Sequence, residues 1–375
     1  MKNRRRTNIV IIALLLIAGY FFYSQNQQLQ KINNRLTDIE DKRLKLIEDK
    51  FGGEKSLKCN ESETVKKVRS SVVRVIGGEA EGSGFVINDD GYVLTNFHVI
   101  EFQPSPKIIF SDNTFETVEI LYADKNADLA VLKINKQLPA INWGNSDYLN
   151  PAEEILALGY PFGGDLSGEA TVKKGYLSAK RRIRDKGLEF LQTDSTLNPG
   201  MSGGPMITVC GEFVGINTLG TAGMGLAISS NSFKQKYLEM IASKEPLKDI
   251  RQITFDPNNS PLDAVSAFYN YIKIRKLDKA FALLDDKFLR GATFENWKRG
   301  YEPNLDTSLI KIENDVEKEN VVNIKLATKD LVGDQIIYKY FEGWWEVKEI
   351  DGSLKLWWPD IKEIKDPDIM WFYEW

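Results

Sequence analysis

Short apolar or alternating segments separated by turn residues fill the sequence from residue 65 to residue 228, and they limit what this chain can fold into. They include SVVRVIGG, GSGFVINDDGYVLTN and EILALGYPFGG. NDDG at Asn88–Gly91 stands between two apolar runs, the pattern of a β-hairpin. Many short strands with regular turns indicate a barrel or a sandwich. Residues 232–244 then have helical spacing, so the sequence predicts a mainly β domain over residues 60–245.

The remainder of the chain, residues 256–375, has a different pattern. Ser260 can cap a helix, Pro261 suits the first helical position, and Asp263 suits the first turn. Apolar residues follow at three- and four-residue spacing, and strand-like runs return after Trp297. This order predicts an α+β domain in which helices precede a sheet.

The first 24 residues have the pattern of a signal anchor. Four basic side chains precede fifteen uncharged residues, Ile9 to Tyr23. As a helix this run spans about 22 Å, and flanking polar residues extend it toward the hydrocarbon thickness of about 30 Å. A cleavable signal peptide is the alternative, but YFFYSQNQQ lacks the small residues that cleavage requires. We therefore expect one transmembrane helix in the cell membrane, with a cytoplasmic N-terminus and everything after Ser24 outside the cytoplasm.

Residues 25–53 are polar, with an apolar seam and no Pro or Gly before Gly52. The seam residues fall at a and d positions of one heptad frame, with Arg43 as an exception: Leu29, Ile32, Leu36, Ile39 and Leu46. This predicts a short coiled-coil stalk. A solvated helical linker is the alternative.

The composition excludes some classes of function. With a net charge of −4, nothing indicates nucleic-acid binding. Two cysteines and one histidine cannot make a four-ligand zinc site, and we expect neither a metal nor a cofactor. Outside the cytoplasm Cys59 and Cys210 can oxidise. We expect two free thiols, with a bridge as the alternative.

The only histidine, His98, lies in YVLTNFHVIE. Ser202 stands between glycines in QTDSTLNPGMSGGP, and Asp128 opens the apolar run DLAVLKI. A carboxylate buried at a strand end needs a partner, and His98 is the only imidazole available. A base, an orienting acid and a hydroxyl are what nucleophilic catalysis requires, and the chain order His–Asp–Ser is the chymotrypsin-like one.

Five blocks occur in the order typical of one protease family: GSGFVINDDGYVLTNFHVI, DLAVLKI, ALGYPFG, GYLSA and QTDSTLNPGMSGGP. Over residues 65–231 the chain resembles the HtrA/Deg branch of trypsin-like serine proteases. The resemblance implies a chymotrypsin-like double β-barrel, with two packed six-stranded antiparallel barrels. It also implies that His98 is the general base, that Asp128 orients it and that Ser202 attacks.

The same resemblance implies an oxyanion hole built from the backbone N–H groups of Gly200, Met201 and Ser202. Met201 stands where the family usually has asparagine. Because the donor there belongs to the main chain, activity should survive this difference.

Substrate contacts are also implied by the resemblance. Leu197 matches the position that lines the primary pocket. GMGLAIS resembles the strand that pairs with substrate and brings Leu226 and Ile228 near it. An apolar pocket favours small or medium aliphatic side chains before the cut. For Asp194 we expect a structural role, in hydrogen bonds to loop backbone.

Most members of this family carry PDZ domains, and no PDZ pattern is visible here. Residues 256–375 instead weakly resemble nuclear-transport-factor-2-like domains through FEGWWEV and GSLKLW. With no histidine there, a binding or oligomerising module is the better interpretation.

The resulting hypothesis is a membrane-anchored serine endopeptidase that cleaves misfolded or regulatory proteins outside the cytoplasm through an acyl-enzyme. The resemblance implies homotrimers, for which the stalk offers a place of contact. The alternatives are a non-catalytic chaperone or scaffold, and a ligand-sensing protein whose C-terminal domain carries the main role.

Overall fold

The computed structural model describes residues 42, 59–77, 80–162, 168–182, 187–221, 223–242 and 254–372. Asn60–Trp375 forms one compact unit. The predicted anchor, residues 1–24, and the predicted stalk, residues 25–53, lie outside the described residues except for Lys42, which is helical. Within the described part of the chain, no helix is both long enough and apolar enough to cross a bilayer.

The chain is mainly β, as predicted, and its first sheet follows a short helix, α2 (Glu61–Arg69). The sheet has seven antiparallel strands in the order β5-β4-β1-β2-β3-β7-β6. They are β1 (Val72–Ile76), β2 (Glu81–Val86), β3 (Tyr92–Thr95), β4 (Lys107–Ile109), β5 (Phe115–Thr117), β6 (Glu119–Asp124) and β7 (Leu129–Lys133). The predicted hairpin is confirmed, because β2 and β3 pair on either side of Asn88–Gly91.

The prediction of two six-stranded barrels is wrong for the first sheet, which has seven strands in an open order with β5 at one edge and β6 at the other. The edge strand β5 pairs with β4 after a tight turn. Asn113 takes a left-handed conformation in that turn, with φ of 61°. Asparagine tolerates this region better than most residues do, so the chain reverses here and adds a strand at the sheet edge.

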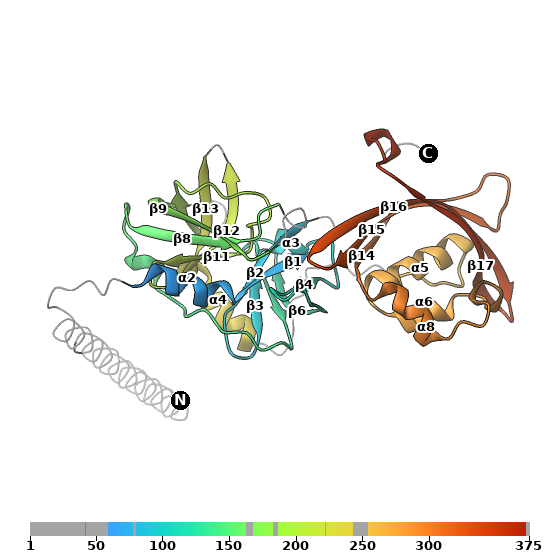
Figure 1. The fold of residues 1–375 in the computed structure, drawn as a ribbon, viewed down its shortest axis with the longest axis horizontal. Helices are drawn as coiled ribbons and strands as arrows, with labels where there is room; N and C mark the ends of the chain where they lie inside the picture. Colours follow the sequence, from blue (N-terminus) through green and yellow to red (C-terminus); the bar gives the residue numbers. More distant parts are fainter. Residues whose placement is uncertain are drawn as a thin grey trace, which may run out of the picture. The chain divides into compact units, whose positions relative to one another are not determined.

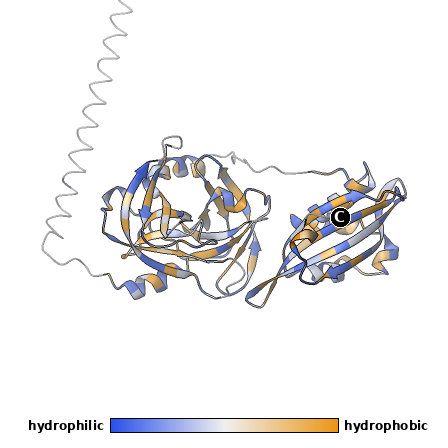
Figure 2. Cartoon of the chain, turned by 90° about the horizontal axis from the view of Figure 1, so that it is seen from above, coloured by the Kyte–Doolittle hydropathy of each residue, from blue (hydrophilic) through white to orange (hydrophobic). Residues whose placement is uncertain are grey.

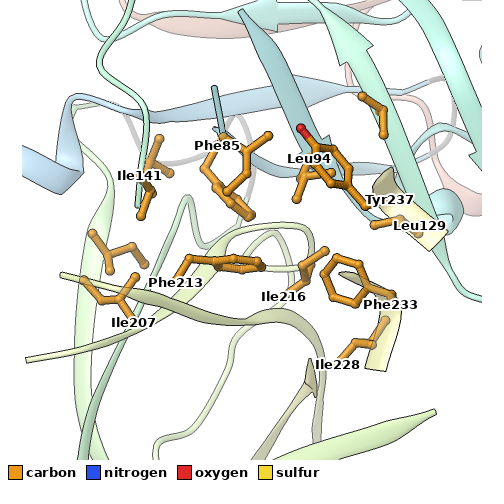
Figure 3. Packing of buried hydrophobic residues seen from close by; sticks show 14 of the residues in the cluster. Phe85, Leu94, Leu129, Ile141, Ile207, Phe213, Ile216, Ile228, Phe233 and Tyr237 are labelled. Carbon is orange, nitrogen blue, oxygen red and sulfur yellow. The ribbon is translucent and has the colours of Figure 1, made fainter. Parts of the chain in front are cut away.

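The second sheet closes into a six-stranded barrel in the order β10-β13-β12-β11-β8-β9. Its strands are β8 (Glu154–Gly159), β9 (Thr171–Arg182), β10 (Glu189–Thr193), β11 (Pro205–Thr208), β12 (Phe213–Thr221) and β13 (Met224–Ser229). Helix α4 (Ser230–Ala242) follows. One buried apolar cluster joins the two sheets, with Phe85 of β2 lying 4.7 Å from Phe213 of β12 between ring centroids (Figure 3). The two sheets therefore share a core, and the loops at their junction are held in place by it.

The C-terminal sheet domain, residues 254–372, begins with helices and ends with a sheet. The helices are α5 (Pro261–Lys273), α6 (Leu277–Ala282), α7 (Asp286–Leu289) and α8 (Phe294–Lys298). The antiparallel strands are β14 (Asn304–Asn314), β15 (Val321–Val332), β16 (Gln335–Ile350) and β17 (Ser353–Ile364). As predicted, Ser260 caps α5 and Pro261 stands at its start. Helices α5, α6 and α8 lie on one face of the curved sheet (Figure 1).

An aromatic cluster holds α5 on that sheet. Phe268 packs edge-on against Trp345 of β16, and the indole N–H of Trp345 donates to the hydroxyl of Tyr269 at 2.9 Å. Along the strands of this domain, apolar residues are interspersed with hydrophilic ones (Figure 2). The nuclear-transport-factor-2 resemblance of this domain stays a prediction, as do the predicted domain boundaries.

Residues of the first sheet contact the C-terminal sheet domain directly. Ile76 and Ile109 share an apolar cluster with Leu305 and Ile336. Beside it, the side-chain amide of Gln103 donates to a carboxylate oxygen of Asp306 at 2.7 Å. The residues in this interface are almost fully buried, so the contact is a packed interface rather than a surface encounter.

The expectation of free thiols is wrong, because Cys59 and Cys210 are both disulfide-bonded. A side chain at Gly211 would lie 3.0 Å from Thr64, so α2 packs closely on the turn after β11. Cys59 lies two residues before α2, and Cys210 precedes Gly211 in that turn. The sequence left the pairing open because it did not indicate where α2 lies.

Lys107 is buried in the interface, where its ammonium group donates to the carbonyl oxygen of Lys273 at 2.8 Å. Burial lowers the pKa of Lys107 to about 7; Asp306 opposes this shift, while Lys273 and Arg275 add to it. At pH values between the folded-state pKa of about 7 and the normal lysine pKa of 10.5, the unfolded chain binds more protons than the folded chain. Lys107 therefore makes the free energy of unfolding increase as the pH rises between these two pKa values. This increase is lost as the pH falls through the folded-state pKa.

We predict that Lys107→Met removes this component of the pH dependence. The measurement is the urea midpoint at several pH values from neutral to alkaline, for the unchanged protein and for the variant. The midpoint should rise with pH more steeply in the unchanged protein. Lys67→Met, at an exposed position on α2, is the control and should keep the steeper rise. Equal slopes for Lys107→Met and the unchanged protein would contradict the burial argument.

Candidate active site

His98 and Asp128 are brought together by neighbouring strands. His98 lies in the short helix α3 (Phe97–Ile100) directly after β3, and Asp128 directly precedes β7. β3 and β7 are paired antiparallel, with Thr95 opposite Ala130. The end of one strand therefore lies beside the start of the other, and sequence positions thirty residues apart become neighbours.

The carboxylate of Asp128 fixes the imidazole ring. Nδ1 of His98 lies 3.0 Å from each carboxylate oxygen, and the backbone N–H of His98 donates to Oδ1 at 3.0 Å. A carboxylate only accepts hydrogen bonds, so Nδ1 carries the proton. Nε2 then keeps its lone pair, and an imidazole held in this way can accept a proton there.

Asp128 is itself held from two further directions. The hydroxyl of Thr218 donates to Oδ2 at 2.8 Å, and the side-chain amide of Asn96 donates to the Asp128 carbonyl oxygen at 2.9 Å. The backbone of Asp128 is left-handed, with φ of 49°. Aspartate is among the few residue types that tolerate this region. The surrounding hydrogen bonds offset the cost and hold the carboxylate toward His98.

Ser202 lies in the loop between β10 and β11, in a backbone that needs glycine. Gly200 and Gly203 have φ of 91° and 85°. A side chain at Gly203 would collide with the carbonyl oxygen of Ser83 in β2. The backbone N–H of Ser83 donates to the Ser202 carbonyl oxygen at 2.7 Å, so strand β2 of the first sheet anchors this loop.

Thr218 connects the serine to the His–Asp pair. The Ser202 hydroxyl donates to the Thr218 carbonyl oxygen at 3.0 Å, while the Thr218 hydroxyl binds Asp128. A hydroxyl carries one proton, so in this rotamer the proton points to Thr218 rather than to His98. Attack on a carbonyl requires this proton to pass to Nε2 of His98 instead, and catalytic hydrogen bonds that form only with substrate are common.

The three N–H groups expected to form an oxyanion hole are not equivalent. The N–H of Met201 donates to the carbonyl oxygen of Asn198 at 3.1 Å, which engages it within the loop. The Met201 side chain is fully buried and packs with Ala157 and Leu197. Gly200 and Ser202 are therefore the better candidates for donors.

Two contacts set the orientation of the loop peptides. The hydroxyl of Ser83 donates to the Gly200 carbonyl oxygen at 2.8 Å, and the N–H of Phe162 donates to the Pro199 carbonyl oxygen at 2.7 Å. In a trans peptide the C=O and N–H groups point in opposite directions. Holding the Pro199 carbonyl toward Phe162 therefore directs the Gly200 N–H away from it.

Of the residues expected to contact substrate, one lies near Ser202 and the other two pack in or against the core between the sheets. Leu197 lies in the same loop as Ser202 and packs against Gly220 and Gly225. Ile228 is 1% exposed and belongs to the core between the sheets, and Leu226 packs against that core. The structure thus brings Leu197 to the site, whereas Ile228 serves the packing of the barrel.

Asp194 has the structural role that the sequence predicts. One of its carboxylate oxygens accepts from the N–H of Tyr176 at 2.7 Å. A side chain at Gly175 would collide with this carboxylate. The bond ties the end of β10 to β9.

Thr218 and Ser83 were not found from the sequence. Threonine is common in strands, and serine is common beside glycine in turns. Neither residue has a spacing that marks it. Their roles depend on which backbone groups face them, and only the folded chain decides that. Among the described residues, no group of three or more His, Cys, Asp or Glu could hold a metal ion.

Residues 82–216 match the trypsin-like peptidase domain family, and the matched segment includes His98, Asp128 and Ser202. This segment is therefore similar to trypsin-like peptidase domains, and the relatives that match the chain are proteases of the HtrA/DegP type. Over 224 residues the chain is 35% identical to the probable periplasmic serine endoprotease DegP-like of Chlamydia muridarum, which covers 57% of this chain and 42% of that relative. Over 165 residues it is 38% identical to serine protease HTRA1 of Xenopus laevis, covering 42% of this chain and 35% of the relative.

A third relative is also a protease of the DegP type. The DegP-like protease of Pseudomonas savastanoi pv. phaseolicola is 46% identical over 140 residues, which are 36% of this chain and 28% of the relative. The chain spans less than half the length of these curated relatives. The similarity therefore concerns the peptidase domain.

Replacing Thr218 with valine tests the bridge that the Thr218 hydroxyl forms to Asp128. Thr218→Val keeps the side-chain shape but removes the hydroxyl that binds Asp128. A hydrogen bond to a charged group contributes about 1.5–3 kcal/mol. We predict that kcat/KM for a peptide substrate falls by about 10- to 100-fold. Thr117→Val, at an exposed position on β5, is the control and should not change kcat/KM. An unchanged kcat/KM for Thr218→Val would show that the bridge has no part in activity.

Proposed function

We propose that the protein is a serine endopeptidase that acts through His98, Asp128 and Ser202. The observation that carries the proposal is the double role of Thr218, which binds Asp128 through its hydroxyl and Ser202 through its carbonyl oxygen. With the Asp128–His98 pair, it holds a base, an orienting carboxylate and a nucleophile in one connected group. The homology to HtrA and DegP proteases supports the same conclusion.

In the proposed reaction Ser202 turns to His98 and attacks the scissile carbonyl carbon. Nε2 of His98 takes the hydroxyl proton, and the N–H groups of Gly200 and Ser202 stabilise the oxyanion. The C–N bond then breaks, His98 gives its proton to the departing amine, and an ester to Ser202 remains. Water, deprotonated by His98, hydrolyses this ester, releases the acid and restores the serine.

We further propose that the enzyme works outside the cytoplasm, anchored by residues 1–24, on misfolded or regulatory proteins. Three observations support this. Two of the relatives named above are called periplasmic endoproteases. Both cysteines are disulfide-bonded, which is typical of oxidising compartments. The sequence at the N-terminus has the basic and apolar pattern of a signal anchor.

The nucleophile is tested by Ser202→Ala. Because the triad acts as a unit, we predict that cleavage of casein or a peptide falls by about six orders of magnitude. Labelling by a fluorophosphonate probe should also disappear. His98→Ala should lower cleavage nearly as far. Ser111→Ala, at an exposed position, should behave like the unchanged protein.

Residual cleavage by Ser202→Ala above about one per cent of normal would overturn the assignment, since a unit of this kind leaves far less. An unchanged protein that neither cleaves nor reacts with the probe would favour a scaffold or ligand-sensing role.

We also propose a homotrimer, supported by the heptad seam and by the confinement of membrane-anchored N-termini to one plane, which raises their effective concentration. We predict that a chain beginning at Gln25 is trimeric by light scattering, and that one beginning at Glu54 associates more weakly. If both are monomeric at concentrations of tens of micromolar, the trimer is wrong and the stalk serves only as a spacer.

A further inference from the structure

A groove of about 1190 Å³ joins the loop before Ser202 to the C-terminal sheet domain. At one end it is lined by Pro199, Gly200 and Glu81, which belong to the peptidase domain. At the other end its lining is mainly aromatic and aliphatic and includes Phe255, Tyr269, Leu309, Ile310, Tyr340 and Phe372. The volume exceeds the range of about 300–1,000 Å³ that is typical of small-molecule sites.

The position of the groove relative to Ser202 indicates which half of a substrate it faces. Leu197 packs against Gly220 of β12 and Gly225 of β13, and β13 is the strand expected to pair with the acyl half of a substrate. Glu81 opens β2 of the first sheet, and β2 reaches the Ser202 loop through the bond between Ser83 and the Ser202 carbonyl oxygen. A polypeptide lying across Ser202 therefore has its leaving half over β2 and directed into the groove.

The C-terminal sheet domain is fixed at this point by contacts to Glu81. The Glu81 carboxylate accepts from Lys329 at 3.0 Å and from the hydroxyl of Tyr338 at 2.6 Å. The side chains of Glu81 and Lys329 are only 10% and 14% exposed. A carboxylate buried this deeply needs its partners, so β2 and the C-terminal sheet domain are held together beside Ser202.

The charges in the lining favour an apolar occupant. Glu81 is paired with Lys329, and Lys273 is paired with Asp306 at 3.1 Å. These side chains balance one another, which leaves the aromatic and aliphatic surface for a ligand. An extended peptide with apolar side chains can bury them there, which is favourable because apolar surface is removed from water.

We propose that this groove binds the part of a substrate that follows the scissile bond, and that it selects extended segments rich in aromatic and aliphatic residues. The proposal rests on the proposed endopeptidase function. It gives the C-terminal sheet domain a direct role in substrate binding. Apolar segments of this kind are exposed by unfolded chains, so the groove also selects for them.

The experiment compares three peptides that share the same residues before the scissile bond. The short peptide ends in a p-nitroanilide, one long peptide continues with five apolar residues, and the other long peptide continues with five polar residues. The full chain is used, and the readout is the kcat/KM of each long peptide divided by that of the short one. We expect the apolar extension to raise kcat/KM by about tenfold or more over the polar one, because binding energy from remote residues contributes to the transition state.

Ile310→Glu places a charge in the groove at a position that is 37% exposed, so the fold should tolerate it. The advantage of the apolar extension should fall to near unity in this variant. Val316→Glu, at a position that is 99% exposed, is the matched control and should keep the full advantage. Thermal melting of both variants checks that they are folded.

Three outcomes overturn the proposal. The apolar extension gives no advantage; or Ile310→Glu keeps the advantage; or Ile310→Glu speeds cleavage of the shorter peptide, which means that a segment of the chain itself occupies the groove. In each of these cases labelling of Ser202 by a fluorophosphonate shows that the endopeptidase function stands. If Ser202 is not labelled and no peptide is cleaved, the proposed function fails, and the groove proposal fails with it.

Discussion

The carboxylate of Asp128 is the interaction on which the site depends. It accepts from the ring and the backbone of His98 and from the hydroxyl of Thr218. These partners come from α3 beside the first sheet and from β12 of the second barrel, so the carboxylate joins the two halves of the peptidase domain at their junction. A carboxylate with fewer partners would cost free energy at this partly buried position. Here the same bonds satisfy it, hold the left-handed backbone of Asp128 and set the histidine tautomer.

The shared core makes this geometry possible. Phe85 and Phe213 meet between the sheets and fix the distance between β2 and β12 (Figure 3). Close packing resists small displacements. The loop that carries Ser202 is thus anchored on one side by Ser83 of β2 and on the other by Thr218 of β12. These two contacts give the serine a defined place beside the His–Asp pair.

The C-terminal sheet domain adds a second constraint on the same strand. Glu81 opens β2 two residues before Ser83, and its carboxylate is bound by Lys329 and Tyr338. A strand that anchors the serine loop is therefore also held by a separate domain. Displacing that domain would break both of these bonds and would loosen the start of β2. In this way the domain is coupled to the site through a chain of direct contacts rather than through a distant effect.

The sequence by itself determined the mainly β character, the hairpin at Asn88–Gly91, the capped start of α5 and the residue types of His98, Asp128 and Ser202. Each of these depends on local spacing or on chemistry that few residue types provide. Tertiary structure alone decided the burial of Ile228 in the core, the pairing of the cysteines and the roles of Thr218 and Ser83. These depend on which backbone and side-chain groups meet across strands that are far apart in the chain. These contacts are set by how the sheets and the C-terminal sheet domain pack. Serine, threonine and isoleucine are common residue types, and no local sequence pattern reveals the contacts that they make.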